Sequence, residues 1–384
     1  MLENNTKLKI AVNCWILRNK NTDGIGYFTI NTISRIIRSH PDVEFLILCD
    51  KNFTEPYFDF PNASKQHIFP ALRHPVLYIF YMEYIVPLFL KKHKPNLFLS
   101  LDGFLTLASK CPQIAVIHDI NFEHYPKDLK LKNRLYYRFF FKRFAHKAAR
   151  IITVSQFSKQ DIVNHYQIDP DKIDIVYNSF NGNFNPLSAA EIQLTRDKWS
   201  RGKPYFFFVG SMHPRKNIKR LMQAFNIFKQ QTGSDCKLLL AGSILWDKSD
   251  LETIYADSPY KADIIFTGRV TDEVLPKLLG SALALSFIPI FEGFGVPIIE
   301  AMQSGVPVIC SNVTSMPEVA GNAALLVDPF NLQDIAHAMQ RISKDVNLKE
   351  QLIQSGKIQK EKFSWDASAI ALWKTISAVL TSKK

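Results

Sequence analysis

Short apolar runs alternate with longer segments of helical period along nearly the whole chain of 384 residues. This alternation is typical of βαβ units, whose crossovers build parallel sheets. Strands are expected at 9–15, 44–49, 96–101, 114–118, 151–154 and 173–177, and again at 205–209, 237–241, 263–267, 283–287, 306–310 and 325–327. An Asn-, Gly- and Pro-rich stretch at 178–186 separates the two sets and has the composition of a linker. The sequence therefore predicts an α/β protein with two parallel-sheet domains.

Charge and composition exclude several classes of protein. The net charge of +12 suggests an anionic partner, which could be nucleic acid, phospholipid headgroups or phosphorylated small molecules. Nucleic acid is disfavoured because no helix-turn-helix, zinc-finger or aromatic-stacking signature is present. Five cysteines without a C-x-x-C pair predict neither a disulfide framework nor a zinc site. Because no apolar stretch reaches the length of a bilayer span or resembles a signal peptide, we expect a cytoplasmic protein.

The segment 290–308 follows a predicted strand and opens a helix. Gly293 and Gly295 would let a ligand approach the backbone, and the free amides at a helix start suit a diphosphate. Glu300, one turn into the helix, could accept hydrogen bonds from two ribose hydroxyls, and Glu292 could hold sugar hydroxyls in the same way. The segment therefore predicts a seat for an anionic ligand, although E-G-x-G alone could be an ordinary tight turn.

The surrounding residues make this pattern more specific. It resembles the carboxylate-x7-carboxylate signature of family 4 glycosyltransferases in Glu292, Gly293, Gly295, Pro297, Glu300, Gly305, Pro307, Ser311, Pro317, Glu318 and Gly321. The resemblance extends from about Gly24 to about Trp365. It implies the GT-B fold, with two Rossmann-like parallel-sheet domains facing a central cleft. We expect an N-terminal acceptor-side domain at 1–182, a nucleotide-sugar-binding domain at 183–364, and a C-terminal helix at 365–384 that packs back across the domain junction.

A second motif lies where the first strand of the second domain ends, and it places Arg215 and Lys216 before the helix expected at 219–231. The resemblance implies that Lys216 neutralises charge on a departing nucleoside diphosphate. Relatives often carry an arginine directly after the glycine, but Ser211 follows Gly210 here, which leaves open whether Arg215 substitutes. The alternative is a solvated turn with helix-flanking charges.

In the first domain, Gly24 and Gly26 resemble the G-I-G-x-Y loop with which these enzymes approach the donor phosphates and the acceptor. The same glycines could begin a dinucleotide fingerprint, but Thr29 occupies the place of its third glycine. His118 ends a predicted strand, and the resemblance implies that it contacts the transferred sugar. No second His or Cys stands at metal-ligand spacing to it. Ser155 is a candidate N-cap of a following helix.

Segment 127–150 holds nine Lys or Arg residues and a single acid. A helical wheel predicts that five apolar residues pack on the sheet, namely Tyr137, Phe140, Phe141, Phe144 and Ala148, while Leu135 and Phe139 lie among the outward-facing cations. Such a face suits an anionic membrane surface, or it is a solvated face whose aromatics have intramolecular partners. Segment 75–94 is apolar on every side, which favours a buried helix over an acceptor groove for a lipid tail.

The resemblance implies a retaining enzyme that moves a hexosyl group from a nucleoside diphosphate sugar, and it weakly favours GDP-mannose as the donor. The acceptor would be a hydroxyl of a glycan or a lipid-linked acceptor in cell-surface polysaccharide synthesis, and neither a cofactor nor a metal is expected. The catalytic residues would be His118, Glu292, Lys216 and Arg215, and the donor-binding residues would be Gly24, Gly26, Gly210, Ser211, Gly293, Phe294, Gly295, Val296 and Glu300. The alternatives are a nucleotide-sugar epimerase of the same fold, an NAD(P)-dependent oxidoreductase, and a non-catalytic nucleotide-sugar binder.

Overall fold

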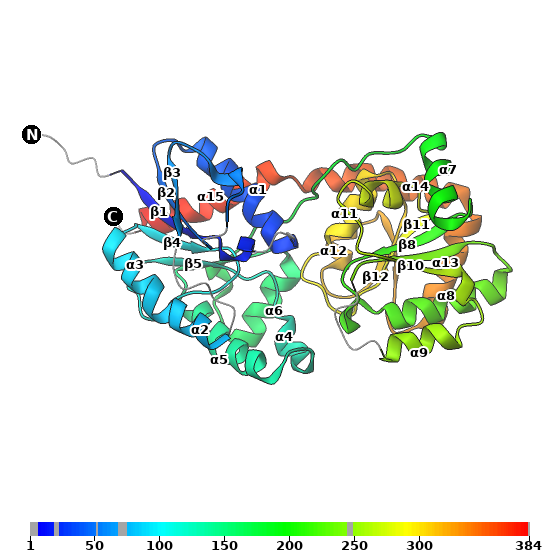
Figure 1. Cartoon of the computed structure of the whole chain (residues 1–384), viewed down its shortest axis with the longest axis horizontal. Helices are drawn as coiled ribbons and strands as arrows, with labels where there is room; N and C mark the ends of the chain where they lie inside the picture. Colours follow the sequence, from blue (N-terminus) through cyan, green and yellow to red (C-terminus); the bar gives the residue numbers. More distant parts are fainter. Residues whose placement is uncertain (1–6, 19–22, 51–52, 68–74, 244–248, 383–384) are drawn as a thin grey trace, which may run out of the picture. The chain divides into compact units, whose positions relative to one another are not determined.

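The computed structural model describes residues 7–18, 23–50, 53–67, 75–243 and 249–382. The chain divides into two compact units (Figure 1). Unit 1 comprises Met1–Ser179 and Ser364–Lys384, and unit 2 comprises Phe180–Phe363.

Unit 1 is built on a seven-stranded parallel sheet with the strand order β3-β2-β1-β4-β5-β6-β7. Its strands are β1 (Lys9–Asn13), β2 (Glu44–Cys49), β3 (Ala63–His67), β4 (Leu97–Ser100), β5 (Gln113–Val116), β6 (Arg150–Thr153) and β7 (Ile173–Ile175). The central strands are almost continuously buried, as expected where helices cover both faces of a parallel sheet. The strand order reverses at β1, which lies between β2 and β4. Ligands of such sheets bind outside the carboxyl ends of the strands at this reversal.

The sequence did not predict β3, whose residues Ala-Ser-Lys-Gln-His carry no apolar alternation. β3 pairs only with β2 and therefore forms an edge of the sheet. An edge strand tolerates polar and charged side chains because only one of its backbone edges is paired. The other predicted strands of this unit are all present.

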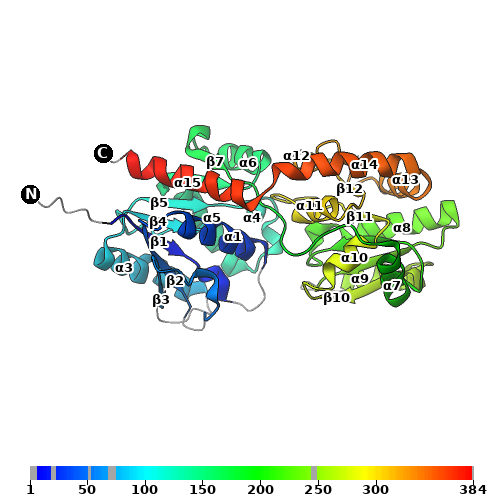
Figure 2. The same cartoon turned by 90° about the horizontal axis from the view of Figure 1, so that it is seen from above.

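The helices of unit 1 are α1 (Gly24–Ser39), α2 (Pro75–Phe80), a π-helix (Tyr81–Ile85), α3 (Val86–His93), α4 (Asn121–His124), α5 (Leu131–Lys147), α6 (Gln156–Tyr166) and α15 (Trp365–Thr381). Ser155 caps α6 as predicted, since its side chain accepts a hydrogen bond from the amide of Ser158. The C-terminal α15 packs on α1, and both views show the two helices side by side (Figures 1 and 2). The ring of Trp373 stacks on that of His40 at a centroid distance of 3.6 Å.

The prediction for segment 75–94 is wrong for one face. Tyr81, Met82, Val86 and Leu90 are buried. Leu77, Phe80, Tyr84 and Leu88 recur at helical spacing and are exposed. The side chains of Pro75 and Val76 lie outside the described residues. A segment that is apolar on every side gives no periodic signal of which face the fold will cover.

Unit 2 contains a six-stranded parallel sheet with the order β10-β9-β8-β11-β12-β13. Its strands are β8 (Tyr205–Val209), β9 (Lys237–Ala241), β10 (Ile264–Gly268), β11 (Ala284–Phe287), β12 (Val308–Ser311) and β13 (Ala324–Val327). Its helices are α7 (Ala189–Ser200), α8 (Ile218–Thr232), α9 (Ser249–Asp257), α10 (Leu275–Gly280), α11 (Val296–Gln303), α12 (Met316–Ala320), α13 (Leu332–Lys344) and α14 (Val346–Gln359). The predicted helix 219–231 is α8. Its apolar residues at helical spacing are all buried, namely Leu221, Ala224, Phe225 and Phe228. This sheet reverses its order at β8, which lies between β9 and β11. Within the described residues, no helix is both long and apolar enough to cross a bilayer.

A partly buried ion pair stabilises the amino ends of β9 and β10. Lys229, whose side chain is only 6% exposed, lies 2.6 Å from Asp263, and Lys237 also bonds that carboxylate. Partial burial raises the pKa of Asp263, but the hydrogen bonds and charges of the two lysines outweigh it, so the pKa lies below its usual range. Asp263 therefore contributes stability that is present above the pKa of an unfolded carboxyl and is lost as the pH falls through the lower folded value.

We expect Asp263→Asn to destabilise unit 2 at pH 7 by about 2 kcal/mol, because it leaves the cation of Lys229 buried without its carboxylate. The melting temperature would fall by about 4–8 °C, and the difference from the wild type would shrink towards pH 3. Asp235→Asn is the control, because Asp235 pairs with Lys203 at the surface and both side chains are about half exposed. Equal melting temperatures for wild type and Asp263→Asn at pH 7 would contradict this assignment.

Candidate active site

The glycine loop between β11 and α11 has a shape that only glycine permits at Gly295. The φ of Gly295 is 103°, and a Cβ there would lie 2.6 Å from the side chain of Met316. The buried hydroxyl of Ser315 forms hydrogen bonds to the carbonyl oxygens of Glu292, at 2.8 Å, and of Phe294, at 3.0 Å. These contacts hold Gly293 and Phe294 in place before Val296, the first residue of α11. The seat for an anionic ligand that the sequence predicts at the start of α11 stays a prediction.

Three of the predicted catalytic residues meet at one atom. Arg215 Nη1 lies 2.8 Å from Oε2 of Glu292, and Nζ of Lys216 bonds the same oxygen. The side chain of Arg215 is 20% exposed, that of Glu292 18% and that of Lys216 10%. This burial rules out the solvated turn that the sequence left open. Arg215 thus lies beside Lys216 at the same carboxylate.

The charges of these residues stay in place at neutral pH. Burial raises the pKa of Glu292, but the charges and hydrogen bonds of Lys216 and Arg215 lower it below its usual range. Glu292 is therefore ionised and balances one of the two neighbouring positive charges. No hydrogen bond from the described residues reaches its other oxygen, Oε1. Arg215 and Lys216 can therefore bind an anion, and Oε1 of Glu292 can accept a hydrogen bond from a hydroxyl group.

A residue that the sequence analysis did not single out, Asn217, joins three loops of unit 2. Asn217 follows Lys216, adopts a φ of 63° and is buried. Its side-chain amide donates to the carbonyl oxygen of Ile288 at 3.2 Å and to that of Pro329 at 2.7 Å. It therefore fixes the loop that carries both cations against the loops after β11 and β13. The only sequence signal for this role is that Asn tolerates the left-handed region.

Gly210 and Ser211 lie at the end of β8, where the chain contacts the loop after β9. A Cβ on Gly242 would lie only 1.8 Å from the carbonyl oxygen of Gly210. Both glycines also have positive φ values, 145° for Gly210 and 142° for Gly242. Close backbone contact therefore requires glycine at Gly242, which the sequence analysis also missed.

Glu300 lies in the second turn of α11 and has an unsatisfied carboxyl. No described residue donates a hydrogen bond to its side chain. Burial, and to a lesser extent the charge of Asp272, raises the pKa of Glu300 to about 8. Such a carboxyl gains when a ligand supplies hydrogen-bond donors, as two neighbouring ribose hydroxyls would.

In unit 1, His118 follows β5 and presents one ring nitrogen. Its Nε2 lies 3.0 Å from the carbonyl oxygen of Leu101, so Nε2 carries the proton and donates. Burial lowers the pKa of His118, which keeps the ring neutral at pH 7. Phe28 of α1 contacts the ring edge-on at 5.1 Å between centroids. His118 can therefore accept a hydrogen bond at Nδ1.

The predicted glycine loop of unit 1 begins α1. Asp23 caps the helix by accepting a hydrogen bond from the amide of Gly26 at 2.9 Å. Gly24 is exposed, and a Cβ there would meet nothing within 4 Å. The space at Gly24 is therefore open to a ligand, whereas the Gly26 amide already has an acceptor. No group of three or more His, Cys, Asp or Glu side chains that could hold a metal ion occurs among the described residues.

Family profiles match the chain in both units. The family profile described as "Glycosyltransferase Family 4" matches residues 22–182, and the one described as "Glycosyl transferases group 1" matches residues 191–359. The chain is 34% identical over 263 residues to the O-antigen chain mannosyltransferase B of Escherichia coli, covering 66% of this chain and 67% of that protein. It is 30% identical to the O-antigen chain mannosyltransferase RfbU of Salmonella typhimurium, covering 60% of this chain and 61% of that protein.

The chain also matches longer proteins and solved structures. It is 28% identical to the serotype-specific mannosyltransferase WbdA of Escherichia coli, of whose length it spans only 32%. A crystal structure of Anabaena Alr3699/HepE in complex with UDP and glucose superposes with a TM-score of 0.74 at 16% identity, covering 97% of this chain and 100% of that chain. This likeness concerns the fold. Taken together, the two family profiles and the identity to O-antigen mannosyltransferases show that the chain belongs to the family 4 glycosyltransferases, and its two Rossmann-like units have the GT-B fold.

Proposed function

We propose that this glycosyltransferase is a retaining mannosyltransferase of cell-surface polysaccharide synthesis. It transfers the sugar from a nucleoside diphosphate donor, with GDP-mannose favoured, to a hydroxyl of a glycan or lipid-linked acceptor. The names of the O-antigen relatives support the sugar and the pathway class. The convergence of Lys216 and Arg215 on one oxygen of Glu292, next to the glycine loop, carries the proposal. No observation favours an epimerase or an oxidoreductase.

In unit 2 the donor diphosphate lies at the start of α11, where the backbone amides and the two cations face it. When the bond to the sugar breaks, negative charge grows on the diphosphate, and Lys216 and Arg215 stabilise it. Both cations are already in position because Glu292 and the Asn217 contacts hold them, so the reaction requires little rearrangement there. These cations supply the charge that a metal would otherwise supply, and we propose that no metal or cofactor takes part.

The carboxylates bind the hydroxyl groups of the donor. Glu300 accepts from the two hydroxyls of the ribose, and Oε1 of Glu292 accepts from the sugar. In unit 1, neutral His118 offers Nδ1 as an acceptor for a sugar hydroxyl. The acceptor hydroxyl attacks on the face from which the diphosphate departs, and the leaving phosphate takes its proton.

Lys216→Ala is expected to lower kcat by about 10²–10³-fold while the Km for the donor changes much less, because the lost charge acts on the developing diphosphate. Steady-state release of the nucleoside diphosphate measures both constants. Lys219→Ala, which removes an exposed lysine one turn along the chain, is the control and should keep wild-type rates. A Lys216→Ala enzyme with full turnover would disprove the role of this cation.

Glu300→Gln tests the raised pKa of Glu300. A carboxyl whose folded pKa is about 8 contributes stability below its unfolded pKa of about 4.3 and loses it as the pH rises through 8. The variant should therefore melt near the wild-type temperature at pH 5 and roughly 10 °C or more above it at pH 9, since a rise of this size in pKa corresponds to a penalty of roughly 5 kcal/mol. Melting curves across this pH range measure the difference, and a constant gap at every pH would contradict the titration.

The same variant tests ribose binding. In the wild type, stabilisation by GDP or UDP should increase between pH 6.5 and 8.5, because the ionised carboxylate accepts both hydroxyls. Glu300→Gln should bind the nucleotide more weakly and without this increase. Nucleotide binding by Glu300→Gln at wild-type strength would remove Glu300 from the site.

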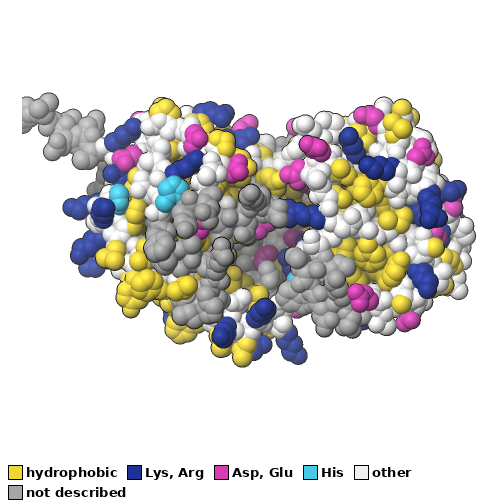
Figure 3. Space-filling view, viewed as in Figure 1, with side chains coloured by type: hydrophobic (Ala, Val, Ile, Leu, Met, Phe, Trp, Pro, Cys, Tyr) yellow, Lys and Arg dark blue, Asp and Glu magenta, His cyan; other side chains and the backbone are white. Residues whose placement is uncertain are grey.

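We further propose that unit 1 binds an anionic membrane through the apolar surface formed by α2, the π-helix, α3 and α5. Seven exposed side chains make up this surface: Leu77, Phe80, Tyr84, Leu88, Leu131, Leu135 and Phe139. Exposed cations accompany it on and beside α5, namely Lys127, Lys130, Lys132, Arg138, Lys142, Arg143 and Lys147. Figure 3 shows hydrophobic side chains gathered at the lower left over α2 and α3, with Lys and Arg side chains at the lower edge.

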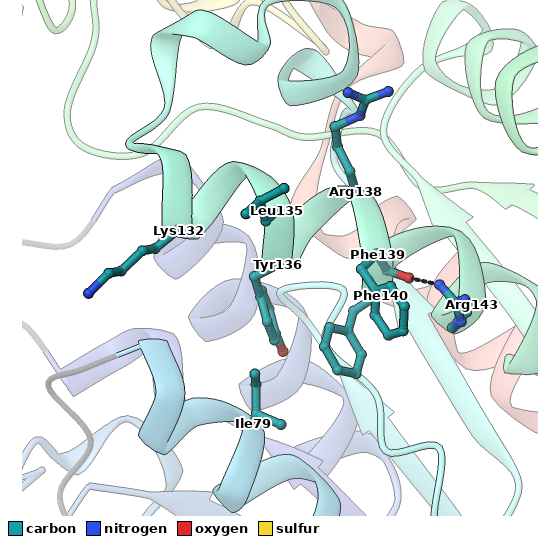
Figure 4. Close-up of a pocket in the computed structure, with 8 residues that line it drawn as sticks. All are labelled: Ile79, Lys132, Leu135, Tyr136, Arg138, Phe139, Phe140 and Arg143. Atoms are coloured by element: carbon teal, nitrogen blue, oxygen red, sulfur yellow. Dashed lines mark hydrogen bonds between the residues drawn. The ribbon is translucent and has the colours of Figure 1, made fainter.

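A groove of about 720 Å³ lies on this surface beside α5, lined by apolar and basic side chains (Figure 4). Leu135 is 61% exposed and Phe139 52%, as the helical wheel predicted. Phe141, Phe144 and Ala148 are buried, also as predicted, but Tyr136 is buried as well and was not expected to be. Exposed apolar side chains between cations match the interface of an anionic bilayer, where the cations pair with headgroups.

The double variant Leu135→Ser with Phe139→Ser should bind phosphatidylglycerol vesicles at least about tenfold more weakly than the wild type in a co-sedimentation assay. Because both side chains are exposed, the melting temperature should not fall. Leu194→Ser in unit 2 is the control, since Leu194 is 70% exposed but lies outside this surface. Absence of vesicle binding by the wild type at low salt would disprove the membrane proposal.

A further inference from the structure

The glycine loop before α11 and His118 lie in different units, and the chain passes from unit 2 back to unit 1 between Phe363 and Ser364. These two residues separate a 3₁₀ helix (Lys360–Lys362) from α15, which begins at Trp365. Both have extended backbone, with a φ of −119° at Phe363 and of −135° at Ser364. Residues at the ends of elements are the positions where a chain most easily changes its φ and ψ angles. An aromatic side chain stands on each side of this connection.

In unit 2, Phe363 contacts the glycine loop. It is 4% exposed, and its ring meets that of Phe294 edge-on at 5.5 Å between centroids. Phe294 lies between Gly293 and Gly295, and its carbonyl oxygen accepts the hydrogen bond from Ser315. Edge-to-face aromatic pairs at this separation favour one relative orientation of the two rings. A change in the glycine loop therefore acts directly on Phe363.

The segment before Phe363 is also fixed to α11, the helix that follows the glycine loop. Nζ of Lys360 donates a hydrogen bond to the side-chain oxygen of Gln303, the last residue of α11, at 2.6 Å. A Cβ on Gly356 of α14 would lie 3.1 Å from the side chain of Met302 in α11, so these two helices are in close contact. The segment that ends at Phe363 is therefore held to the donor side of unit 2 by two helices as well as by an aromatic ring.

In unit 1, Trp365 is connected to His118 through a single ring. Trp365 contacts Phe28 edge-on at 6.1 Å between centroids, and Phe28 contacts His118 edge-on at 5.1 Å. Phe28 is 0% exposed and Trp365 8%, so both rings are packed in the core. The hydrogen bond from Nε2 to Leu101 fixes one point of the imidazole, and the ring of Phe28 fixes its tilt. Trp365 thus lies behind the ring that orients His118.

The helix that begins at Trp365 is fixed to α1, the helix that carries Phe28. Nε of Arg35 in α1 lies 2.6 Å from Oδ1 of Asp366 in α15. Further along, the two helices remain in contact. The segment 363–365 is therefore attached at one end to the helix that follows the glycine loop of unit 2, and at the other end to the helix that begins at the glycine loop of unit 1.

We propose that Phe363 and Trp365 are positioning residues, which transmit donor binding at the glycine loop to the ring of His118. A nucleoside diphosphate at the start of α11 fixes the glycine loop, and Phe363 follows through its contact with Phe294. The change at the connection then moves Trp365, and Phe28 passes the movement to the imidazole. The donor favours one orientation of His118 to the extent that it binds one arrangement of the glycine loop more tightly. This inference rests on the proposed function, because it takes His118 as the residue that contacts the sugar.

The NMR signals of the His118 ring test this coupling. Saturating GDP or UDP, whichever stabilises the protein against heat, should shift the imidazole C–H signals of the wild type, because the imidazole moves relative to the ring of Phe28. Phe363→Leu and Trp365→Leu keep both positions apolar and leave the residues that bind the nucleotide unchanged. Both variants should therefore bind the nucleotide as tightly as the wild type in calorimetric titrations. The shift of the His118 signals, however, should largely disappear in both.

Trp373→Leu is the matched control, because it removes the same side chain from the same helix. Trp373 stacks on His40 rather than on Phe28, so its loss should lower the melting temperature and leave the His118 shift unchanged. Retention of the full shift in Phe363→Leu and Trp365→Leu would show that the nucleotide affects His118 by another route, and the inference would be wrong. Loss of the shift in Trp373→Leu as well would also overturn it, because the effect would then belong to α15 as a whole.

A double-variant cycle measures the same coupling in turnover. Phe28→Leu and Phe363→Leu should each lower kcat by about 5- to 10-fold at saturating donor, with little change in the Km for the donor. Because both act through His118, the double variant should be no slower than the slower single variant. The two residues lie in different units, so two independent effects would multiply. Multiplied effects in the double variant would contradict the inference.

Nucleotide binding separates this inference from the proposed function. If GDP or UDP stabilises the wild type against heat but leaves the His118 signals unchanged, the coupling fails and the transferase assignment stands. If neither nucleotide stabilises the protein, both proposals fail.

Discussion

Two positive charges held at one carboxylate oxygen are the interaction on which the site in unit 2 depends. Lys216 and Arg215 are adjacent in sequence and partly buried, so they would repel each other without the negative charge of Glu292. Glu292 comes from the loop after β11, whereas the cations come from the loop after β8. The ion pairs thus join two loops that meet where the strand order reverses. Asn217 and Ser315 complete the arrangement by tying the backbones of these loops to their neighbours.

Several buried polar groups of this protein are paired with other groups of the chain. Tyr205 donates to the carbonyl oxygen of Leu278, Tyr166 donates to Glu123, and Lys229 is paired with Asp263. These groups stabilise the fold and need nothing from a ligand. The carboxyl of Glu300, by contrast, has no donor among the described residues. Such unsatisfied groups represent hydrogen-bonding capacity that the fold holds ready for a bound molecule.

The sequence by itself determined where the strands lie along the chain, apart from β3, because strands buried on both faces need continuous apolar runs. It also located Glu292, Gly295 and Glu300, since a loop and the helix that follows it place residues by local spacing. The tertiary structure alone decided that Arg215 joins Lys216 at Glu292. It also revealed the roles of Asn217, Gly242 and Ser315. Their roles arise from contacts between distant segments, such as the Asn217 bond to Pro329 across 112 residues, and no local pattern encodes such contacts.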